Sequence, residues 1–186
     1  MKLYIQNMVS LRCKLMVKSE LEKLGLEFIS IELGEIDLKK DIDPASLSLL
    51  KNALHQSGLE IINDKNSMLI EKIKNIVVEM VHYSDELPSL NFSDYLSQQL
   101  HVDYRYASEI FSKTKGITIE HFIILHKIEK VKELIIYDEL NLSEIAWKMH
   151  YSSAAHLSNQ FKKTTELTPS FFKNLKNKNR MTLESL

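Results

Sequence analysis

Apolar and polar positions follow two patterns along the chain, short alternating runs at first and longer helical stripes after them. In the first run, Leu3 and Ile5 alternate with polar residues, which is typical of a half-buried strand. Three further short runs rich in branched and aromatic residues also predict strands. The four predicted strands are residues 2–8, 26–33, 35–38 and 59–62.

Two helical stretches separate these predicted strands. Residues 11–24 carry leucines in helical register and end at a glycine, which suits a helix C-terminus. Asp43 and Pro44 open a second helix that runs to about Gln56, because proline fits the first helical turn. The order βαββαβ over residues 1–65 predicts a ferredoxin-like module, in which two helices cover one face of a sheet.

A wide apolar stripe follows at residues 67–83. Its leading positions, at alternating spacings of four and three, are Leu69, Ile73, Ile76 and Met80. Such a stripe either forms the seam of a homodimer or packs on its own domain, and we expect the second because it is more common. Pro88 and the polar residues before it mark a linker, so residues 66–88 are predicted to be a connecting helix and linker.

The pattern of apolar positions over residues 89–186 predicts helices and no strands. One apolar stripe at helical spacing consists of Leu142, Ile145, Ala146 and Met149. After a short polar turn, a second helix over Ala154–Lys163 carries Leu157 and Phe161 on one face. Its other face carries amides, hydroxyls and an imidazole, which suit base edges, and it ends in lysines, which suit phosphates. This is the layout of a helix-turn-helix.

A weaker copy of this pattern lies about fifty residues upstream, with its second helix predicted over Tyr104–Thr114. Between the copies, Ile119–Tyr137 contains no glycine or proline and predicts one long amphipathic helix. Two such readers on one face of B-DNA enter grooves about 34 Å apart. The predicted fold class is therefore α+β, a ferredoxin-like βαββαβ module followed by an all-α double helix-turn-helix domain over 89–186.

These blocks resemble the DNA-binding domain of AraC/XylS-type bacterial transcription regulators. The matching residues are Ser143-Glu144-Ile145-Ala146, Tyr151-Ser152-Ser153, Leu157-Ser158-x-x-Phe161-Lys162-Lys163 and Leu167-Thr168-Pro169-Ser170-x-Phe172. The resemblance implies sequence-specific binding of double-stranded DNA by two recognition helices in transcription control. The residues it implies at base edges are Arg105, Ser108 and Glu109 in the first helix and Ala154, Ala155, His156, Ser158 and Asn159 in the second. The residues implied for contact with the DNA backbone are Lys113, Lys162, Lys163 and Thr168.

Five positions depart from the family pattern. The two turns carry His101 and His150 where the family usually has glycine, and histidine is among the few other residues that tolerate left-handed dihedral angles. Glu166 replaces a further glycine. Asn159 stands where arginine is frequent, and asparagine prefers adenine. The carboxylate of Glu109 repels phosphates and accepts only from cytosine, so we expect an unusual DNA site or modest affinity.

Composition narrows the function classes. The net charge of −1 argues against a uniformly basic binder, but residues 148–180 contain seven Lys or Arg and one acid, Glu166. That local excess is the footprint expected of a DNA-binding surface. A single cysteine, no spanning apolar stretch and no signal-peptide pattern lead us to expect a cytoplasmic protein without a membrane partner. The sequence shows no phosphate-binding glycine loop or catalytic cluster, so we expect no enzyme.

The segment Asn7–Cys13 resembles the metal-binding loop of heavy-metal-associated domains, which carry Met-x-Cys-x-x-Cys. Ser10 takes the first cysteine position and only Cys13 remains. Soft metals need at least two thiolates, so we expect no metal, no cofactor and inert packing of Cys13. The module would then sense an unknown effector or mediate dimerisation. The alternatives are a protein-binding module that has lost DNA, and a metal- or thiol-responsive protein that acts through Cys13.

Overall fold

A computed structural model describes residues 1–84, 91–175, 180–181 and 183 of the 186. Contacts divide the chain into two compact units. The first unit contains Met1–Ile76 and Leu90–Ile110. The second unit contains Val77–Ser89 and Phe111–Leu186. The linker predicted around Pro88 lies outside the described residues.

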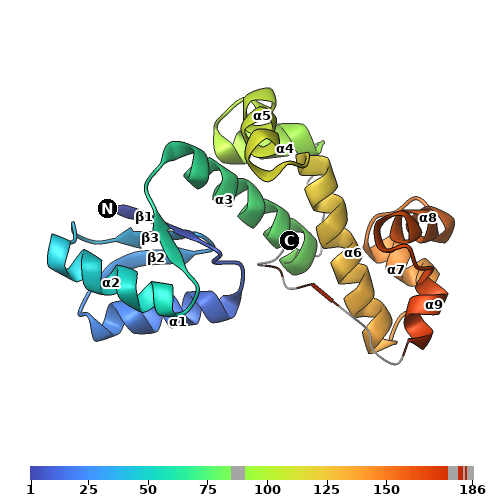
Figure 1. The fold of residues 1–186 in the computed structure, drawn as a ribbon, viewed down its shortest axis with the longest axis horizontal. Coiled ribbons are helices and arrows are strands. Elements are labelled where there is room, and N and C mark those ends of the chain that lie inside the picture. Colours follow the sequence, from blue (N-terminus) through green and yellow to red (C-terminus); the bar gives the residue numbers. More distant parts are fainter. Residues whose placement is uncertain (85–90, 176–179, 182, 184–186) are drawn as a thin grey trace. The chain divides into compact units, whose positions relative to one another are not determined.

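The first part of the chain has the element order βαββαβ (Figure 1). They are β1 (Lys2–Gln6), α1 (Leu11–Lys23), β2 (Phe28–Glu32), β3 (Glu35–Leu38), α2 (Pro44–Gln56) and β4 (Glu60–Ile62). The sheet has the order β2-β3-β1-β4, and each neighbouring pair is antiparallel. Helix α2 begins at the predicted proline because the Asp43 carboxylate accepts hydrogen bonds from the backbone N–H groups of Ala45 and Ser46.

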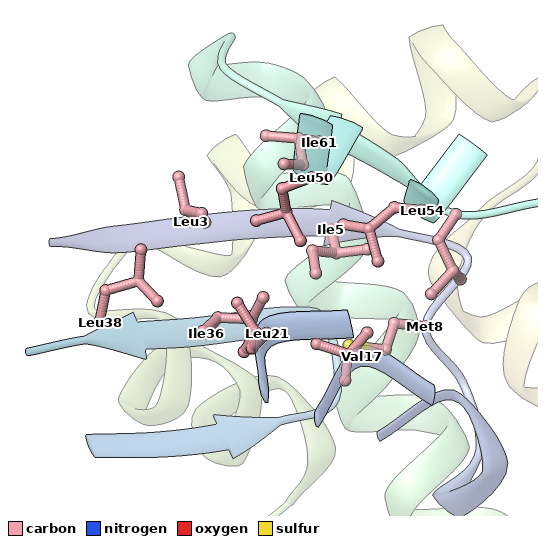
Figure 2. Packing of buried hydrophobic residues seen from close by; sticks show 11 residues of the cluster. Leu3, Ile5, Met8, Val17, Leu21, Ile36, Leu38, Leu50, Leu54 and Ile61 are labelled. Carbon is pink, nitrogen blue, oxygen red and sulfur yellow. The ribbon is translucent and has the colours of Figure 1, made fainter. Parts of the chain in front are cut away.

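One apolar cluster packs α1 and α2 onto the sheet (Figure 2). Leu3 and Ile5 of β1 are buried, as their alternation with polar residues predicts. Their partners in the cluster are Ile36 and Leu38 of β3, Val17 and Leu21 of α1, and Leu50 and Leu54 of α2. Because alternate residues of a strand face the same side of a sheet, both helices cover one face.

Helix α3 (Lys65–Val78) contacts this module through buried polar groups. Glu71 and Lys74 form an ion pair, with 2.9 Å between Oε1 and Nζ, and both side chains are almost completely buried. The Glu71 carboxylate also accepts a hydrogen bond of 3.3 Å from the backbone N–H of Asn7. A charged pair that is shielded from water in this way depends on each partner remaining in place.

Two further contacts attach α3 to the sheet. Asn75 Nδ2 donates to the Leu33 carbonyl at 3.1 Å. The adjacent Gly34 has a φ of +74°, and a Cβ there would lie 2.0 Å from Asn75 Nδ2, so both the backbone and the close contact require glycine. Lys72 Nζ lies 4.9 Å from the ring centre of Tyr4, which alternates with the core residues of β1. Helix α3 therefore contacts the sheet face opposite α1 and α2.

The helix predicted over 67–83 is interrupted before its end. Helix α3 gives way to a π-helical turn, η1 (Glu79–Tyr83). Ile70, Ile73 and Val77 of the apolar stripe are buried within the chain. This is the burial expected of a stripe that packs on its own chain.

After residue 90, all the secondary-structure elements that the structure describes are helices. They are α4 (Phe92–Leu100), α5 (Tyr104–Lys115), α6 (Ile119–Tyr137), α7 (Leu142–Lys148), α8 (Ala154–Thr165) and α9 (Pro169–Asn174). Helix α6 has the predicted bounds, because the Thr118 hydroxyl caps its start and Asp138 adopts a left-handed conformation at its end. A small sheet followed by a helical domain confirms the predicted α+β class. Within the described ranges, no helix is both long and apolar enough to cross a membrane.

Candidate nucleic-acid interface

Helices α7 and α8 form the helix-turn-helix predicted near the end of the chain. A capping box starts α7, in which the Asn141 side chain accepts from the Glu144 N–H and the Glu144 carboxylate accepts from the Asn141 N–H at 2.7 Å. The Ser153 hydroxyl starts α8 by accepting from the His156 N–H at 3.1 Å. The buried residues of the two helices include Ile145, Ala146, Leu157 and Phe161. The opposite face of α8 is left exposed.

Helices α4 and α5 repeat this arrangement. Helix α4 ends at His101, whose φ is 55°. The Asp103 carboxylate caps α5 by accepting from the Arg105 N–H at 2.9 Å. Phe111 is buried in α5, at the place in the repeat that Phe161 occupies in α8. Each pair therefore buries one aromatic side chain from its second helix.

The predicted reading residues of α8 share one face of the helix. Those that are exposed are Ala155, His156, Asn159, Lys162 and Lys163, whereas Ala154 and Ser158 are half-buried. Thr168 is exposed, but its hydroxyl already accepts from the Phe171 N–H at 3.2 Å and caps α9. Polar groups near the start of α8 and lysines in its last turn thus form one solvent-facing strip.

The predicted residues of α5 also share a face, since three of them are spaced four apart. Arg105, Glu109 and Lys113 are exposed, and Ser108 is half-buried. Positive groups at both ends of this strip flank one carboxylate. The structure thus brings together the predicted residues of each helix.

Comparison with known proteins finds a match in the same part of the chain. Residues 96–174 match the helix-turn-helix domain family. This region is an AraC-type helix-turn-helix domain. Domains of this type are the DNA-binding modules of transcription regulators.

Two similar proteins are bacterial HTH-type transcriptional regulators. The uncharacterized HTH-type transcriptional regulator YtdP of Bacillus subtilis is 23% identical over 157 residues, which cover 82% of this chain and 20% of that protein. An uncharacterized HTH-type transcriptional regulator of Staphylococcus aureus is 24% identical over 162 residues, with the same shares of 82% and 20%. The chain spans about a fifth of the length of these relatives. Residues 96–186 make up about half of the chain, so the similarity also includes residues before 96.

A solved structure shares the fold. The C-terminal domain of AraT, a response regulator from Geobacillus stearothermophilus, is 21% identical, with a TM-score of 0.50. The match covers 64% of this chain and 92% of that domain.

The AraC-type domain keeps left-handed backbone at the turn positions where the family usually has glycine. The angle φ is 55° at His101, 57° at His150 and 63° at Glu166. Gly116, the counterpart of Glu166 in the first repeat, has a φ of 73°. The structure thus confirms that both histidines adopt the conformation predicted for the turns. A side chain in this region costs about 1 kcal/mol relative to glycine.

Glu166→Gly is expected to raise the free energy of unfolding by roughly 0.5–1 kcal/mol, because it relieves this backbone strain. Gly116→Ala is the matched opposite change, and we expect it to lower the free energy by about 1 kcal/mol. A Cβ at Gly116 would meet no atom within 4 Å, so its effect reports the backbone alone. Urea unfolding of the two variants beside the unmodified chain measures both effects. Equal changes of the same sign would contradict the assignment.

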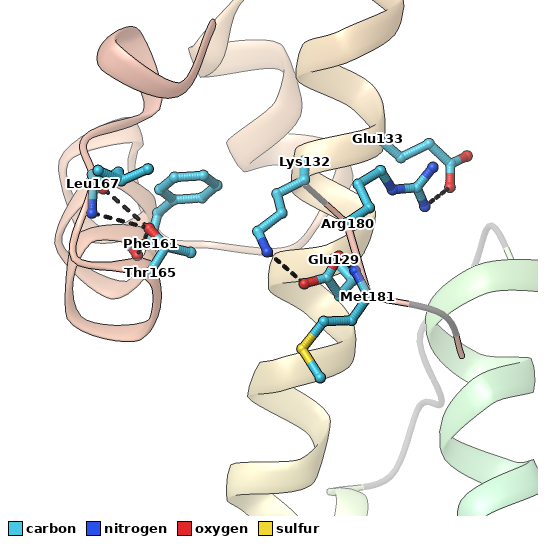
Figure 3. Close-up of polar contacts among 8 residues, drawn as sticks. All are labelled: Glu129, Lys132, Glu133, Phe161, Thr165, Leu167, Arg180 and Met181. Atoms are coloured by element: carbon cyan, nitrogen blue, oxygen red, sulfur yellow. Dashed lines mark hydrogen bonds and ion pairs between the residues drawn. The ribbon is translucent and has the colours of Figure 1, made fainter. Parts of the chain in front are cut away.

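A polar network on α6 attaches the end of the described chain to the AraC-type domain (Figure 3). Glu129 is buried, and one carboxylate oxygen lies 2.5 Å from Lys132 Nζ. Its other oxygen accepts from the Met181 N–H at 3.0 Å. Arg180 forms an ion pair of 2.9 Å with Glu133. Residues 180–181 therefore lie against the long helix between the two repeats.

A histidine pair joins η1 to α6. Nε2 of His82 lies 3.2 Å from Nδ1 of His126. Burial and the charges of Lys130 and Arg180 lower the pKa of His82 to about 4, although Glu133 acts in the opposite direction. A neutral His82 shares a hydrogen bond with His126 without charge repulsion. Sequence reasoning missed this pair because 44 positions separate its members.

Cys13 lies in the first turn of α1. Cys13 is half-buried and packs against the core of the N-terminal module. Its Sγ lies 3.2 Å from the hydroxyl of Ser10, which caps α1. In the part of the chain that the structure describes, no three His, Cys, Asp or Glu side chains form a group suited to a metal ion.

Proposed function

We propose that this chain is a sequence-specific DNA-binding transcription regulator whose α5 and α8 enter successive major grooves. One observation carries the proposal: each helix buries one aromatic side chain and exposes an opposite polar face. The major groove of B-DNA admits an α-helix, and its base edges distinguish all four base pairs by hydrogen bonds. The similarity to bacterial HTH-type transcriptional regulators supports the proposal.

Helix α8 is proposed as the stronger reader. Asn159 is suited to a bidentate contact with adenine, and the serine and imidazole groups before it are suited to neighbouring base edges. The residues proposed at bases are Ala154, Ala155, His156, Ser158 and Asn159. Lys162 and Lys163 then neutralise DNA phosphates at the end of the helix. Thr168 contacts the DNA backbone through groups other than those that cap α9.

Helix α5 is proposed as the weaker reader. Arg105 is suited to guanine, Ser108 to either purine or pyrimidine edges, and Glu109 to the amino group of cytosine. Lys113 contacts a phosphate. Because a carboxylate repels the backbone, Glu109 lowers affinity for every sequence that does not offer it a cytosine.

The N-terminal part is proposed as a sensing or dimerisation module. Its strand order and the two helices on one sheet face support a ferredoxin-like architecture for residues 1–65. Residues 66–88 would connect this module to the DNA-reading residues 89–186. An effector bound to the module, or a second copy of the chain, would act on DNA binding through α3.

Selection of bound sites from random DNA tests the proposal, followed by titrations of the selected site at several salt concentrations. We expect an enriched sequence and an affinity that falls with salt, because lysines release counterions from the phosphates. Asn159→Ala should lose discrimination at one base pair, by about 1–3 kcal/mol. Lys162→Ala is the matched control, and it should weaken binding to all sequences and reduce the salt slope by about 1.

The opposite result would be a pool without enrichment and an affinity that does not change with salt. The AraC-type domain would then have kept its fold and lost the ability to bind DNA. Binding of a protein partner would be the better proposal for its function. Equal losses on all sequences for Asn159→Ala would place that side chain on the DNA backbone.

A further inference from the structure

A row of side chains links α6 to the first turn of α8. Lys127 Nζ on α6 donates to the Met149 carbonyl in the turn at 3.2 Å, and it lies 5.5 Å from the ring centre of Tyr151. The Tyr151 ring meets the imidazole of His156 almost at right angles, with centres 5.3 Å apart. The Ser152 hydroxyl oxygen lies 3.0 Å from Nδ1 of the same imidazole.

This row runs from half-buried to exposed side chains. Burial lowers the pKa of Lys127 and raises the pKa of Tyr151 to about 12. The Tyr151 hydroxyl is buried and has no hydrogen-bond partner among the described residues, so Tyr151 acts through its ring. His156 at the other end is exposed. The half-buried part of the row therefore supports an exposed imidazole.

Two contacts restrain the imidazole ring and leave one nitrogen available. The Tyr151 ring limits the tilt of the imidazole, and Ser152 occupies Nδ1. Nε2 of His156 makes no hydrogen bond to any residue in the described ranges. His156 lies in the first turn of α8, and the first residues of a recognition helix are those that contact base edges.

Nε2 is a donor in one of the two neutral tautomers and in the protonated imidazole. When the Ser152 hydroxyl donates to Nδ1, the single proton of a neutral imidazole is on Nε2. In a protonated imidazole both nitrogens donate. A donor in the major groove meets N7 on both purines, with O6 beside it on guanine.

We infer that His156 donates a hydrogen bond from Nε2 to a purine N7, and that Ser152, Tyr151 and Lys127 are positioning residues that orient the ring for it. This inference rests on the proposed function and names one specificity contact within it. Part of the sequence preference of α8 is thus set by residues outside the helix, on α6 and in the turn.

A purely structural role for these side chains would give a different pattern of DNA affinities. If these residues only stabilised the turn, their loss would weaken binding to all DNA by the same factor. Orientation of a donor affects only the DNA that carries the acceptor. The ratio of affinities for two DNA duplexes that differ in one N7 atom therefore separates the two roles, and it is independent of the active fraction of protein.

The experiment replaces each purine of the selected α8 half-site, one at a time, by its 7-deaza analogue, which lacks N7. For the unmodified full chain, we expect affinity to fall about fivefold at one purine, the effect of one hydrogen bond. His156→Ala should abolish the difference at that purine. Ser152→Ala should lose most of it while the protein still binds the unmodified site, and Lys127→Met should give an intermediate ratio.

Tyr137→Phe is the matched control, because Tyr137 is 64% exposed at the end of α6 and lies outside this row. Its 7-deaza ratio should equal that of the unmodified chain. The inference is overturned if no purine shows a 7-deaza effect, if Ser152→Ala keeps the full effect, or if Tyr137→Phe loses it. Failure of the proposed function itself would already appear as a selection without an enriched sequence.

Discussion

Phe161→Ala is expected to lower the free energy of unfolding of the AraC-type domain by about 3–5 kcal/mol. Phe161 is fully buried, and its ring packs against Phe172 of α9 with centres 5.6 Å apart. Removing the ring leaves a cavity between α8 and α9, because the surrounding helices relax only in part. Urea unfolding of the full chain, followed by circular dichroism, measures the loss. Binding to a selected DNA site should fall with it.

Phe171→Ala is the matched control for this change. Phe171 precedes Phe172 on the same helix, but 56% of its surface is exposed. We expect an effect within about 0.5 kcal/mol, as for most surface substitutions. If both variants were equally destabilised, the packing of α8 on α9 would not be the cause.

Glu71→Ala is expected to destabilise the N-terminal module by about 3–5 kcal/mol. The change leaves the charge of Lys74, whose side chain is 4% exposed, without its partner in a site shielded from water. It also removes the acceptor of the Asn7 N–H. Urea unfolding of the full chain, followed by circular dichroism, reports the midpoint and slope of the transition.

Glu71→Leu combined with Lys74→Met tests the physical reason. The double variant leaves no buried charge, so its stability should lie close to that of the unmodified chain. Glu71→Leu alone, Lys74→Met alone and the double variant form a cycle whose coupling energy belongs to the pair. A double variant as unstable as the sum of the single variants would show that shape, and not charge, makes the contact.

Local sequence signals predicted the helices and their bounds well. The spacing of apolar residues and the absence of glycine and proline predicted Ile119–Tyr137, and the structure places α6 at those bounds. Caps explain this success, since Asp43 and Asn141 accept hydrogen bonds from the N–H groups of the residues that follow them. Such contacts connect residues a few positions apart and are therefore visible in the sequence.

The candidate site was also predictable to a useful degree. Helical periodicity separates the buried Leu157 and Phe161 from the polar face that carries His156 and Asn159. The half-burial of Ala154 was not predictable, because it depends on how α8 packs on its neighbours. Contact of these residues with DNA stays a prediction that the selection experiment tests.

The contacts that orient the helices and strands relative to one another leave no comparable signal in the sequence. In the sequence, Glu71 and Lys74 look like an ordinary pair on the surface of a helix. Only the folded chain shows that this pair is buried and that Asn75 lies against Gly34.

By itself, the sequence determined where most of the helices begin and end, which face of each is apolar, and which polar residues gather on α5 and α8. The tertiary structure alone decided that Lys127 reaches the turn before α8 and that His82 lies against His126. The physical reason is the distance along the chain over which each interaction acts. Helix caps and apolar stripes join residues within two turns, whereas these side chains meet only after whole elements have packed.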